Sequence, residues 1–554
     1  MTRPMDIDTT LLSPEAQTAL LEAITRSHHH RSRSGERPGS DLGVRLPLPP
    51  PSAIAAAESS LPSPSSPDYL AGRPAADVVS HITRDILPAM TGQAQSGRYY
   101  GFVTGGALPV GQWADGLVGR IDQNVQVHLP SQTAATAVED SALEMAARLV
   151  GLDAAAFPGR TITTGATACN MLGLACGREA VVADGSGSGS GSGNGSTAGG
   201  DGGGIGELGI LEACSRKGIR EFQVLTSGGH SSLSKAASIV GLGRRSVKEL
   251  GISRDEPWIL DLDAVEDHLA RPAVASIISV SAGEVNTGRY AVRDMPRLRA
   301  LADKYGAWIH VDAAFGIFAR LLPDSHEFAT LKKQVEGLEL ADSITIDAHK
   351  VLNVPYDCGI FFTRSLSTLQ AVCTNGNAAY LLSASADAPS SIPSPLNVGL
   401  ENSRRFRALP LYAVLLSEGR AGLSGYVTSM VRLSRRLASY IQVSEHYDLL
   451  PDAPDGAETQ GDGDGDGDAI DQIFIIVLFR ARDARVNDVL VERINATRSM
   501  YVSGTSWRGE KAARIAVSSW KVDADADFDV VTSILEDVAL EGRGDRSRGV
   551  TSHE

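Results

Sequence analysis

The sequence predicts an α/β fold in which a large domain, built on a mostly parallel sheet, precedes a small α+β domain. From about residue 76 to residue 400, short apolar segments alternate with segments of helical length and periodicity. The apolar segments are nearly continuous, as in 274–280, which is typical of strands covered on both faces of a parallel sheet. After residue 400 the alternation stops, and long helical stretches accompany only a few further strands.

Each expected element follows from this pattern. In the large domain we expect strands at 161–164, 221–226, 274–280, 307–311, 343–346 and 358–363. Helices are expected at 139–150, 167–180, 231–241, 261–270 and 294–305. Asp261 and Asp294 stand where a side chain can accept hydrogen bonds from the first N–H groups of a helix. In the small domain we expect helix through 404–441 and at 484–497 and 527–540, with strands at 473–479 and 514–519.

Low-complexity stretches divide the 554-residue chain. Residues 1–75 are rich in Pro, Ser, His and Arg and predict a disordered or polyproline II tail. The large domain, 76–400, has a Gly/Ser insert at 184–206, and the small domain, 401–541, has an insert at 452–469 with seven acids and no base. A short tail is expected at 542–554. Both inserts are placed in loops, where added length costs little.

Composition excludes several classes of protein. The formal net charge of −15 lacks the basic footprint of nucleic-acid binders, and no stretch has the roughly 18 apolar residues of a membrane span. The N-terminus shows no apolar segment of a secretory signal. The five cysteines are odd in number and form no Cys-x-x-Cys pair, so we expect no disulfide framework and no metal site. The expected compartment is the cytoplasm.

Two segments place ionisable side chains at strand ends. Lys350 directly follows the buried strand 343–346, at the sheet edge where ligands bind in open α/β folds. Schiff-base chemistry needs a lysine held in a low-polarity site, although a lysine in a surface loop has the same local sequence. Asp312 ends the apolar strand 307–311, where a carboxylate needs a cationic partner. A protonated pyridine nitrogen is one such partner, and an aspartate that caps a turn is the alternative.

Two further segments fit a phosphate and a flat ring. In 164–170 a strand leads into a helix whose N–H groups, beside Gly165 and the hydroxyl of Thr167, can bind phosphate. An ordinary capped helix is the alternative. His230 follows strand 221–226, where an imidazole can stack on a heteroaromatic ring or orient a carboxylate. The alternative there is a helix start capped by Ser231 or Ser232.

In this order the four segments resemble the group II pyridoxal-phosphate-dependent amino acid decarboxylases, which include the aromatic-L-amino-acid, glutamate and histidine decarboxylases. The resemblance covers roughly residues 76–540, apart from the inserts. Further segments that match the family are 98–106, 283–288, 353–359, 404–407 and 514–519.

The resemblance implies a type I pyridoxal-phosphate-dependent transferase (aminotransferase-like) fold and a homodimer. It implies a carboxy-lyase that releases CO2 from an L-amino acid through a Schiff base on Lys350. Asp312 pairs with the ring nitrogen, His230 stacks on the ring and Ala314 lies beneath it. Ala166, Thr167 and His349 lie at the phosphate. The substrate is expected to meet Tyr100 and Phe102.

From the residues alone, the roles of several aromatic and basic side chains stay open. Tyr100, Phe102, Trp113 and Tyr380 can line an aromatic pocket or belong to the core, and the core is favoured for Trp113. The arginines at 404, 405 and 407 can meet an acidic substrate, but a surface or interface role is favoured.

The sequence departs from the family in its catalytic loop. The matching stretch, 383–398, contains no tyrosine to protonate the substrate carbon, and Tyr380 is the nearest phenol. Alternatives to decarboxylation are therefore aldehyde-forming oxidative deamination, transamination, another C–C or C–S lyase reaction and a non-catalytic role. Asp347 also stands where aromatic amino acid decarboxylases have Asn, and Val351 where Trp is usual.

Overall fold

The computed structural model describes residues 46–183, 204–374, 392–451 and 469–548. Its main sheet has seven strands in the order β1-β7-β6-β5-β4-β2-β3. The strands are β1 (Gly159–Thr163), β2 (Glu221–Thr226), β3 (Val247–Glu249), β4 (Val274–Ser281), β5 (Trp308–Asp312), β6 (Ser343–Asp347) and β7 (Gly359–Thr363). All pairings are parallel except those of β7 with its two neighbours. The predicted mostly parallel α/β fold is confirmed.

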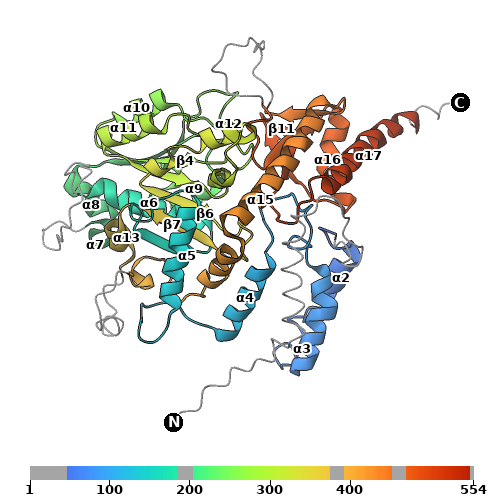
Figure 1. The fold of residues 1–554 in the computed structure, drawn as a ribbon, viewed down its shortest axis with the longest axis horizontal. Helices are drawn as coiled ribbons and strands as arrows, with labels where there is room; N and C mark the ends of the chain where they lie inside the picture. Colours follow the sequence, from blue (N-terminus) through green and yellow to red (C-terminus); the bar gives the residue numbers. More distant parts are fainter. Residues whose placement is uncertain (1–45, 184–203, 375–391, 452–468, 549–554) are drawn as a thin grey trace.

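Helices cover both faces of this sheet (Figure 1). One face carries α6 (Ala166–Val182), α9 (Ser231–Ile239) and α13 (Leu366–Cys373), and the other packs against elements that include α5 (Ala135–Leu149) and α11 (Met295–Tyr305). Successive side chains of β4 show the division, since Ile277 packs with α6 and α9 whereas Ile278 joins the larger core on the other side. Double coverage explains the apolar strands, because both side-chain directions lead into a core.

A long helix links the main sheet to the second one. Helix α15 (Ala408–Val443) packs on α4 (Pro109–Ile121) and α5, and is broken at Gly419, whose φ of 56° lies in the left-handed region. The second sheet is antiparallel, in the order β10-β11-β9-β8. It is formed by β8 (Tyr447–Leu450), β9 (Ile476–Ala481), β10 (Ser503–Trp507) and β11 (Glu510–Ala516), with α16 (Ala484–Ala496) and α17 (Ala526–Arg548).

The remaining elements are short. Helices α2 (Pro51–Ser60) and α3 (Ala75–His81) precede α4, and α7 (Ile205–Leu208) and α8 (Ile210–Lys217) lie before β2. Helix α10 (Leu262–Leu269) follows β3, and α12 (Ala329–Gln334) follows β5. Single turns of 3-10 or π helix lie at 82–86, 87–89, 244–246, 316–321, 326–328, 338–340 and 395–397.

The local signals identified most elements of the large domain. Asp261 and Asp294 cap α10 and α11, as predicted. The reversed direction of β7 and the strands β8 and β10 were not predicted. Helix α17 continues to Arg548, past the predicted start of the tail at 542.

The prediction of a disordered or polyproline II tail is wrong for 51–60, which form α2. Proline is tolerated in the first turn of a helix, and the alanines that follow have the highest helix propensity. Residues 1–45 and most of the two inserts lie outside the described residues. Within those described, no helix is long and apolar enough to cross a membrane.

We propose the domain boundary near residue 400, since the two sheets lie within 159–363 and 447–516.

Candidate active site

A cavity of about 250 Å³ opens where the carboxyl ends of the central parallel strands meet. Its polar side chains come from different strands, helices and loops. They are Thr104, His230, Ser281, Asp312, Lys350, Tyr356 and Arg514. Ligands bind at this edge of open α/β sheets, because the strand ends leave room there between the loops.

Lys350 lies in the turn after β6 and reaches into this cavity. Its Nζ lies 3.1 Å from Oδ2 of Asp347, the last residue of β6, and 5.8 Å from the ring centroid of Phe315. The Lys350 side chain is 22% exposed and that of Asp347 only 3%. Since a buried carboxylate needs a cation, Asp347 and Lys350 hold each other in place.

Asp312 ends β5 and faces the same cavity. Its Oδ1 accepts a hydrogen bond from the backbone N–H of Ala314 at 3.3 Å, and Ala314 also lines the cavity. Its Oδ2 accepts one from Nδ2 of Asn170, on α6, at 2.8 Å. Asn170 lies in the predicted phosphate segment, but the sequence assigned it no role because only the tertiary fold brings α6 to the end of β5.

His230 precedes α9 and caps it. Its Nδ1 accepts a hydrogen bond from the backbone N–H of Ser232 at 3.1 Å and lies 2.6 Å from the Ser232 hydroxyl. Burial lowers the pKa of His230, and the Lys350 charge lowers it further against an opposing effect of Asp312. The ring is therefore neutral at pH 7, with its proton on Nε2, because Nδ1 is an acceptor.

The amino end of α6 approaches the cavity closely. A Cβ on Gly359 would lie 2.5 Å from Cα of Gly165, so two glycines let β7 and the start of α6 touch. Ala166 lines the cavity, whereas Thr167, the next residue, and His349 do not. His349 lies behind, where its Nδ1 accepts a hydrogen bond from the Cys358 N–H at 3.1 Å and burial lowers its pKa.

The predicted aromatic residues separate in the structure. Phe102 lines the cavity and is 50% exposed. Tyr100 is fully buried in the core and does not reach the cavity. Trp113, for which the core was favoured, is 38% exposed on α4. Tyr380 and residues 383–391 of the loop lie outside the described residues.

The three arginines after residue 400 are already paired. Arg404 is bound by Glu139 in the interior, Arg405 by Asp115, and Arg407 by Asp357 and Glu401. A role in meeting an acidic substrate is therefore not supported for them. The cationic residue that lines the cavity besides Lys350 is Arg514 of β11.

Arg514 carries a positive charge without an ion-pair partner among the described residues. Its guanidinium donates to the carbonyl oxygens of Val285 and, at 2.9 Å, of Gly101, while its buried Nε has no partner within the described chain. The hydroxyl of Thr104, also in the cavity lining, is buried without a partner there as well. The cavity thus offers a cation and polar atoms to an anionic ligand.

Comparison with known proteins gives a consistent result. Residues 215–455 match the pyridoxal-dependent decarboxylase conserved domain. An L-2,4-diaminobutyrate decarboxylase of Acinetobacter baumannii is 30% identical over 41% of this chain and 43% of its own. A phenylacetaldehyde synthase of Arabidopsis thaliana is 23% identical over 52% and 56%. The match therefore spans about half the length of these curated relatives.

Solved structures show the same fold over nearly the whole chain. The Oryza sativa TDC with PLP and tryptamine superposes with a TM-score of 0.71 at 18% identity, covering 98% of this chain and 99% of that one. The Rhodiola rosea 4-hydroxyphenylacetaldehyde synthase gives a TM-score of 0.70 at 17% identity, covering 97% and 99%. Residues 215–455 are thus similar to the pyridoxal-dependent decarboxylase conserved domain, and the chain shares the fold of these solved structures.

Proposed function

We propose that this protein is a pyridoxal-phosphate-dependent carboxy-lyase that releases CO2 from an L-amino acid. The observation that carries the proposal is that Lys350, Asp312 and His230, which are far apart in the sequence, line one cavity. A lysine amine, a carboxylate and an imidazole are the three groups needed to bond an aldehyde, pair with a pyridine N–H and stack on a ring.

The residues present fit the cofactor. Lys350 would bond to its aldehyde, and Asp312 would face the ring nitrogen. His230 and Ala314 would lie on opposite faces of the ring. The backbone N–H groups of Ala166 and Thr167 would bind the phosphate, with His349 nearby. The close contact of Gly359 with Gly165 leaves no side chain in the way there. When bound, the cofactor supplies an electron sink for the pair of electrons left when a bond to the α-carbon breaks.

The protein's own groups orient the substrate and handle its protons. Asp312 places a carboxylate at the base of the site, and Asp347 would hold the Lys350 amine close to the reacting atoms. Arg514, unpaired in the cavity, would bind the substrate carboxylate, and Phe102 and Phe315 give the cavity an apolar side that limits water. A low-polarity site strengthens each of these charge interactions.

The role of Arg514 predicts a defect in substrate binding. In Arg514→Gln, the KM for the amino acid should rise tenfold to a hundredfold, since a hydrogen bond to a charged group contributes about 1.5–3 kcal/mol. Affinity for pyridoxal phosphate should change little. Steady-state kinetics and a cofactor titration measure the two effects. The surface variant Arg508→Gln, in the turn between β10 and β11, is the control, and an unchanged KM in Arg514→Gln would exclude the role.

Tyr356 lines the cavity and offers it a phenol. The stretch that matches the family's catalytic loop, 383–398, contains no tyrosine. The ring of Tyr356 packs against that of His349, with centroids 4.5 Å apart and ring planes tilted by 35°, and Tyr356 is half exposed. Burial, with the nearby Asp347 charge, raises the pKa of Tyr356 to about 12, so the hydroxyl keeps its proton at neutral pH. We propose that this hydroxyl protonates the substrate α-carbon after CO2 has left.

Replacing Tyr356 with phenylalanine should therefore slow amine formation about a hundredfold, the lower part of the range for general acid catalysis. Cofactor affinity should stay constant, because the ring still packs on His349. Tyr412→Phe, on α15 and outside the cavity lining, is the matched control. A normal rate of amine release by Tyr356→Phe would assign the proton to another group, such as Tyr380.

The reaction itself is tested by product analysis. The protein with pyridoxal phosphate is incubated with pooled L-amino acids, and the products are read by mass spectrometry. A product lighter than its substrate by CO2 supports the proposal and names the substrate. The curated relatives do not settle the substrate, since they include diaminobutyrate, aspartate, tyrosine/DOPA and tryptophan decarboxylases.

An aldehyde product would instead support aldehyde-forming oxidative deamination. Two observations favour this as the second candidate: the loop lacks a tyrosine, and two of the relatives described above are named aldehyde synthases. Molecular oxygen would then be the oxidant and be reduced to hydrogen peroxide, water would supply the aldehyde oxygen, and ammonia and CO2 would be released. Another C–C or C–S lyase reaction would give a fragment of different mass. No product and no bound cofactor would point to a non-catalytic homologue.

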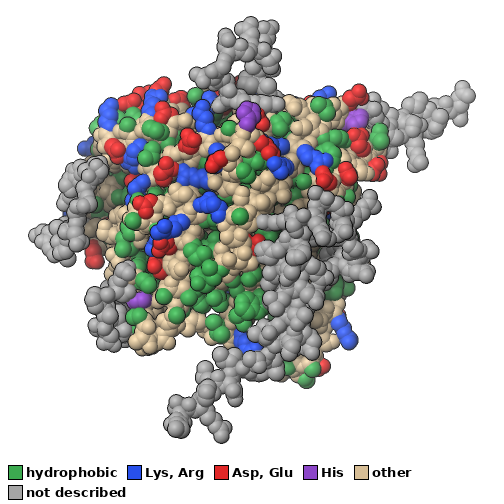
Figure 2. Space-filling view, viewed as in Figure 1, with side chains coloured by type: hydrophobic (Ala, Val, Ile, Leu, Met, Phe, Trp, Pro, Cys, Tyr) green, Lys and Arg blue, Asp and Glu red, His purple; other side chains and the backbone are tan. Residues whose placement is uncertain are grey.

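We also propose a cytoplasmic homodimer. Figure 2 shows apolar side chains over α5, α4 and the first half of α15, in the lower half of the view. Trp113 and Ile121 of α4 and Leu416 of α15 are exposed. Phe102 and Tyr356, at the cavity, are half exposed too, so a second copy would complete the site. Light scattering should give a molar mass of twice 58.2 kDa.

All five cysteines are free thiols, which suits the proposed cytoplasmic location, since the cytoplasm is a reducing compartment.

A further inference from the structure

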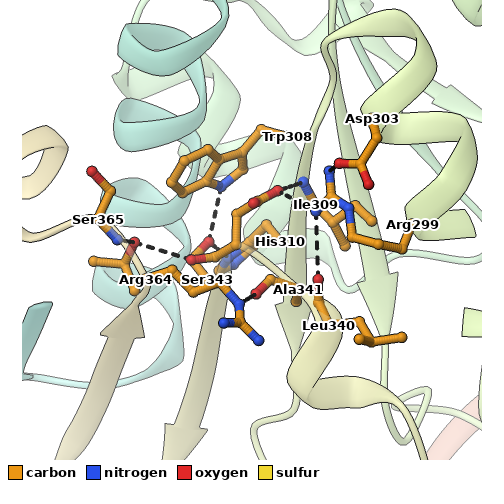
Figure 3. Close-up of polar contacts among 12 residues, drawn as sticks. Arg299, Asp303, Trp308, Ile309, His310, Leu340, Ala341, Ser343, Arg364 and Ser365 are labelled. Carbon is orange, nitrogen blue, oxygen red and sulfur yellow. Dashed lines mark hydrogen bonds and ion pairs between the residues drawn. The ribbon is translucent and has the colours of Figure 1, made fainter. Parts of the chain in front are cut away.

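A row of buried polar side chains lies behind Asp312 and takes no part in the chemistry described so far. Asn170 Oδ1 lies 2.9 Å from Nε2 of His310, and His310 Nδ1 lies 2.8 Å from the hydroxyl of Ser343. The indole N–H of Trp308 donates to that hydroxyl at 3.0 Å. Figure 3 shows Trp308, His310 and Ser343 grouped on the adjacent strands β5 and β6. Asn170, His310 and Ser343 have no exposed surface.

The two ends of this row fix the position of every proton within it. An indole N–H can only donate, and a carboxylate can only accept. Trp308 therefore donates a hydrogen bond to the Ser343 hydroxyl. That hydroxyl in turn donates a hydrogen bond to Nδ1 of His310. His310 then donates from Nε2 to Asn170 Oδ1, which leaves the Asn170 amide N–H groups directed at Asp312. The hydrogen bonds run in one direction from Trp308 to Asp312, and each bond in such a chain strengthens the next.

The interior supports this arrangement of His310. Burial lowers the pKa of His310 to about 4, so the ring is neutral and carries a single proton, as the chain requires. Helix α6 makes room for the ring at Gly173, where an added Cβ would lie 2.3 Å from Cε1 of His310. The imidazole is thus seated directly against the helix that carries Asn170.

A second branch leads from Asn170 to the other side of the cavity. Asn170 Nδ2 donates to Asp312 at 2.8 Å and also to the Ser232 hydroxyl at 3.1 Å. The Ser232 hydroxyl, 2.6 Å from Nδ1 of His230, donates a hydrogen bond to that nitrogen. One N–H group of the Asn170 amide therefore holds Asp312 directly, and the other holds His230 through the Ser232 hydroxyl.

We propose that Asn170 is a positioning residue that fixes Asp312 and His230 relative to each other, and that the Trp308–Ser343–His310 row holds its amide in the orientation that does so. The inference rests on the proposed use of pyridoxal phosphate. With Asn170 in place, Asp312 keeps a free acceptor site directed at the cavity, and the imidazole of His230 is held at a set angle.

The test measures cofactor binding rather than turnover. Asn170→Asp is nearly isosteric but replaces the N–H donors with an oxygen that faces the Asp312 carboxylate. We expect its dissociation constant for pyridoxal phosphate, from equilibrium dialysis, to rise tenfold to a hundredfold. At saturating cofactor, the visible circular-dichroism band per bound cofactor should fall to less than half of the wild-type value, because the ring is no longer held at one angle.

Ser343→Ala is the second variant, for the case that Asn170→Asp fails to fold. It removes one hydroxyl from the row and adds no charge to the core. It should raise the dissociation constant threefold to tenfold. Ser279→Ala, equally buried in β4 but outside the row, and Asn495→Asp, in the small domain, are the controls and should bind as the wild type does.

The outcomes separate the two proposals. Wild-type affinity and band intensity in Asn170→Asp or, where that variant does not fold, in Ser343→Ala overturn this inference alone. The same holds if Ser279→Ala loses as much affinity as Ser343→Ala. Failure of the wild-type protein to bind pyridoxal phosphate overturns the proposed function and this inference with it.

Discussion

Replacing Lys350 with alanine is expected to lower the rate of CO2 release at least about a thousandfold, because acid–base and nucleophilic work by one positioned amine spans about 10²–10⁴ in rate. Borohydride treatment of the wild-type protein with pyridoxal phosphate should add the mass of the reduced cofactor to the peptide that contains Lys350. The variant should show no such addition. Initial rates of ¹⁴CO2 release and peptide mass spectrometry make the two measurements.

Two controls separate lost chemistry from lost structure. Lys350→Arg keeps a positive charge beside the buried Asp347 but lacks an amine that can bond to an aldehyde, so it should fold and remain inactive. Lys304→Ala removes an exposed lysine that pairs with Glu266 and should be fully active. Full activity in Lys350→Arg would contradict the proposed function.

Replacing Glu139 with glutamine is expected to reduce the free energy of unfolding by about 3 kcal/mol, since removing one partner of a buried ion pair leaves an unpaired charge in the interior. The side chains of Arg404 and Glu139 are 1% and 7% exposed, and Nη1 of Arg404 donates to Glu139 at 3.0 Å. The pair connects the segment before α15 to α5. Urea denaturation followed by circular dichroism measures the loss.

The adjacent arginine provides a matched control. Arg405 pairs with Asp115 at the surface, where the two side chains are 43% and 32% exposed. Asp115→Asn should therefore cost less than 1 kcal/mol. The double variant Glu139→Leu/Arg404→Met should recover much of the lost stability, because neither charge is then buried. Equal losses in Glu139→Gln and Asp115→Asn would contradict the buried-pair account.

Local signals were sufficient for much of the large domain. Strand β2 and the caps of α10 and α11 were predicted from the sequence and are seen where expected, because apolar runs and capping aspartates act over a few residues. The sequence did not predict that β7 runs antiparallel to its neighbours. An apolar strand that is buried on both faces has the same composition whichever way it runs. The alanine-rich helix α2 was missed because nearby prolines and serines dominated the composition.

The candidate site divides in the same way. Lys350, Asp312 and His230 were recognisable because each follows or ends a strand, and strand ends of a parallel sheet meet at one edge. Arg514 and Tyr356 were not assigned to the cavity, since they reach it from β11 and from a loop after Lys350. Tyr100 was expected there, but its position in the sequence could not show that its ring turns into the core.

The sequence by itself thus determined the alternation that builds the sheet, the side chains at the strand ends and the resemblance to the pyridoxal-phosphate-dependent decarboxylases. Only the tertiary structure decided how these side chains are held. Asn170, His310 and Ser343 lie on three separate elements, and their hydrogen bonds form only when α6 crosses β5 and β6. The physical reason is that chemical identity and local periodicity are properties of neighbours along the chain, whereas orientation and burial depend on contacts between residues far apart in it.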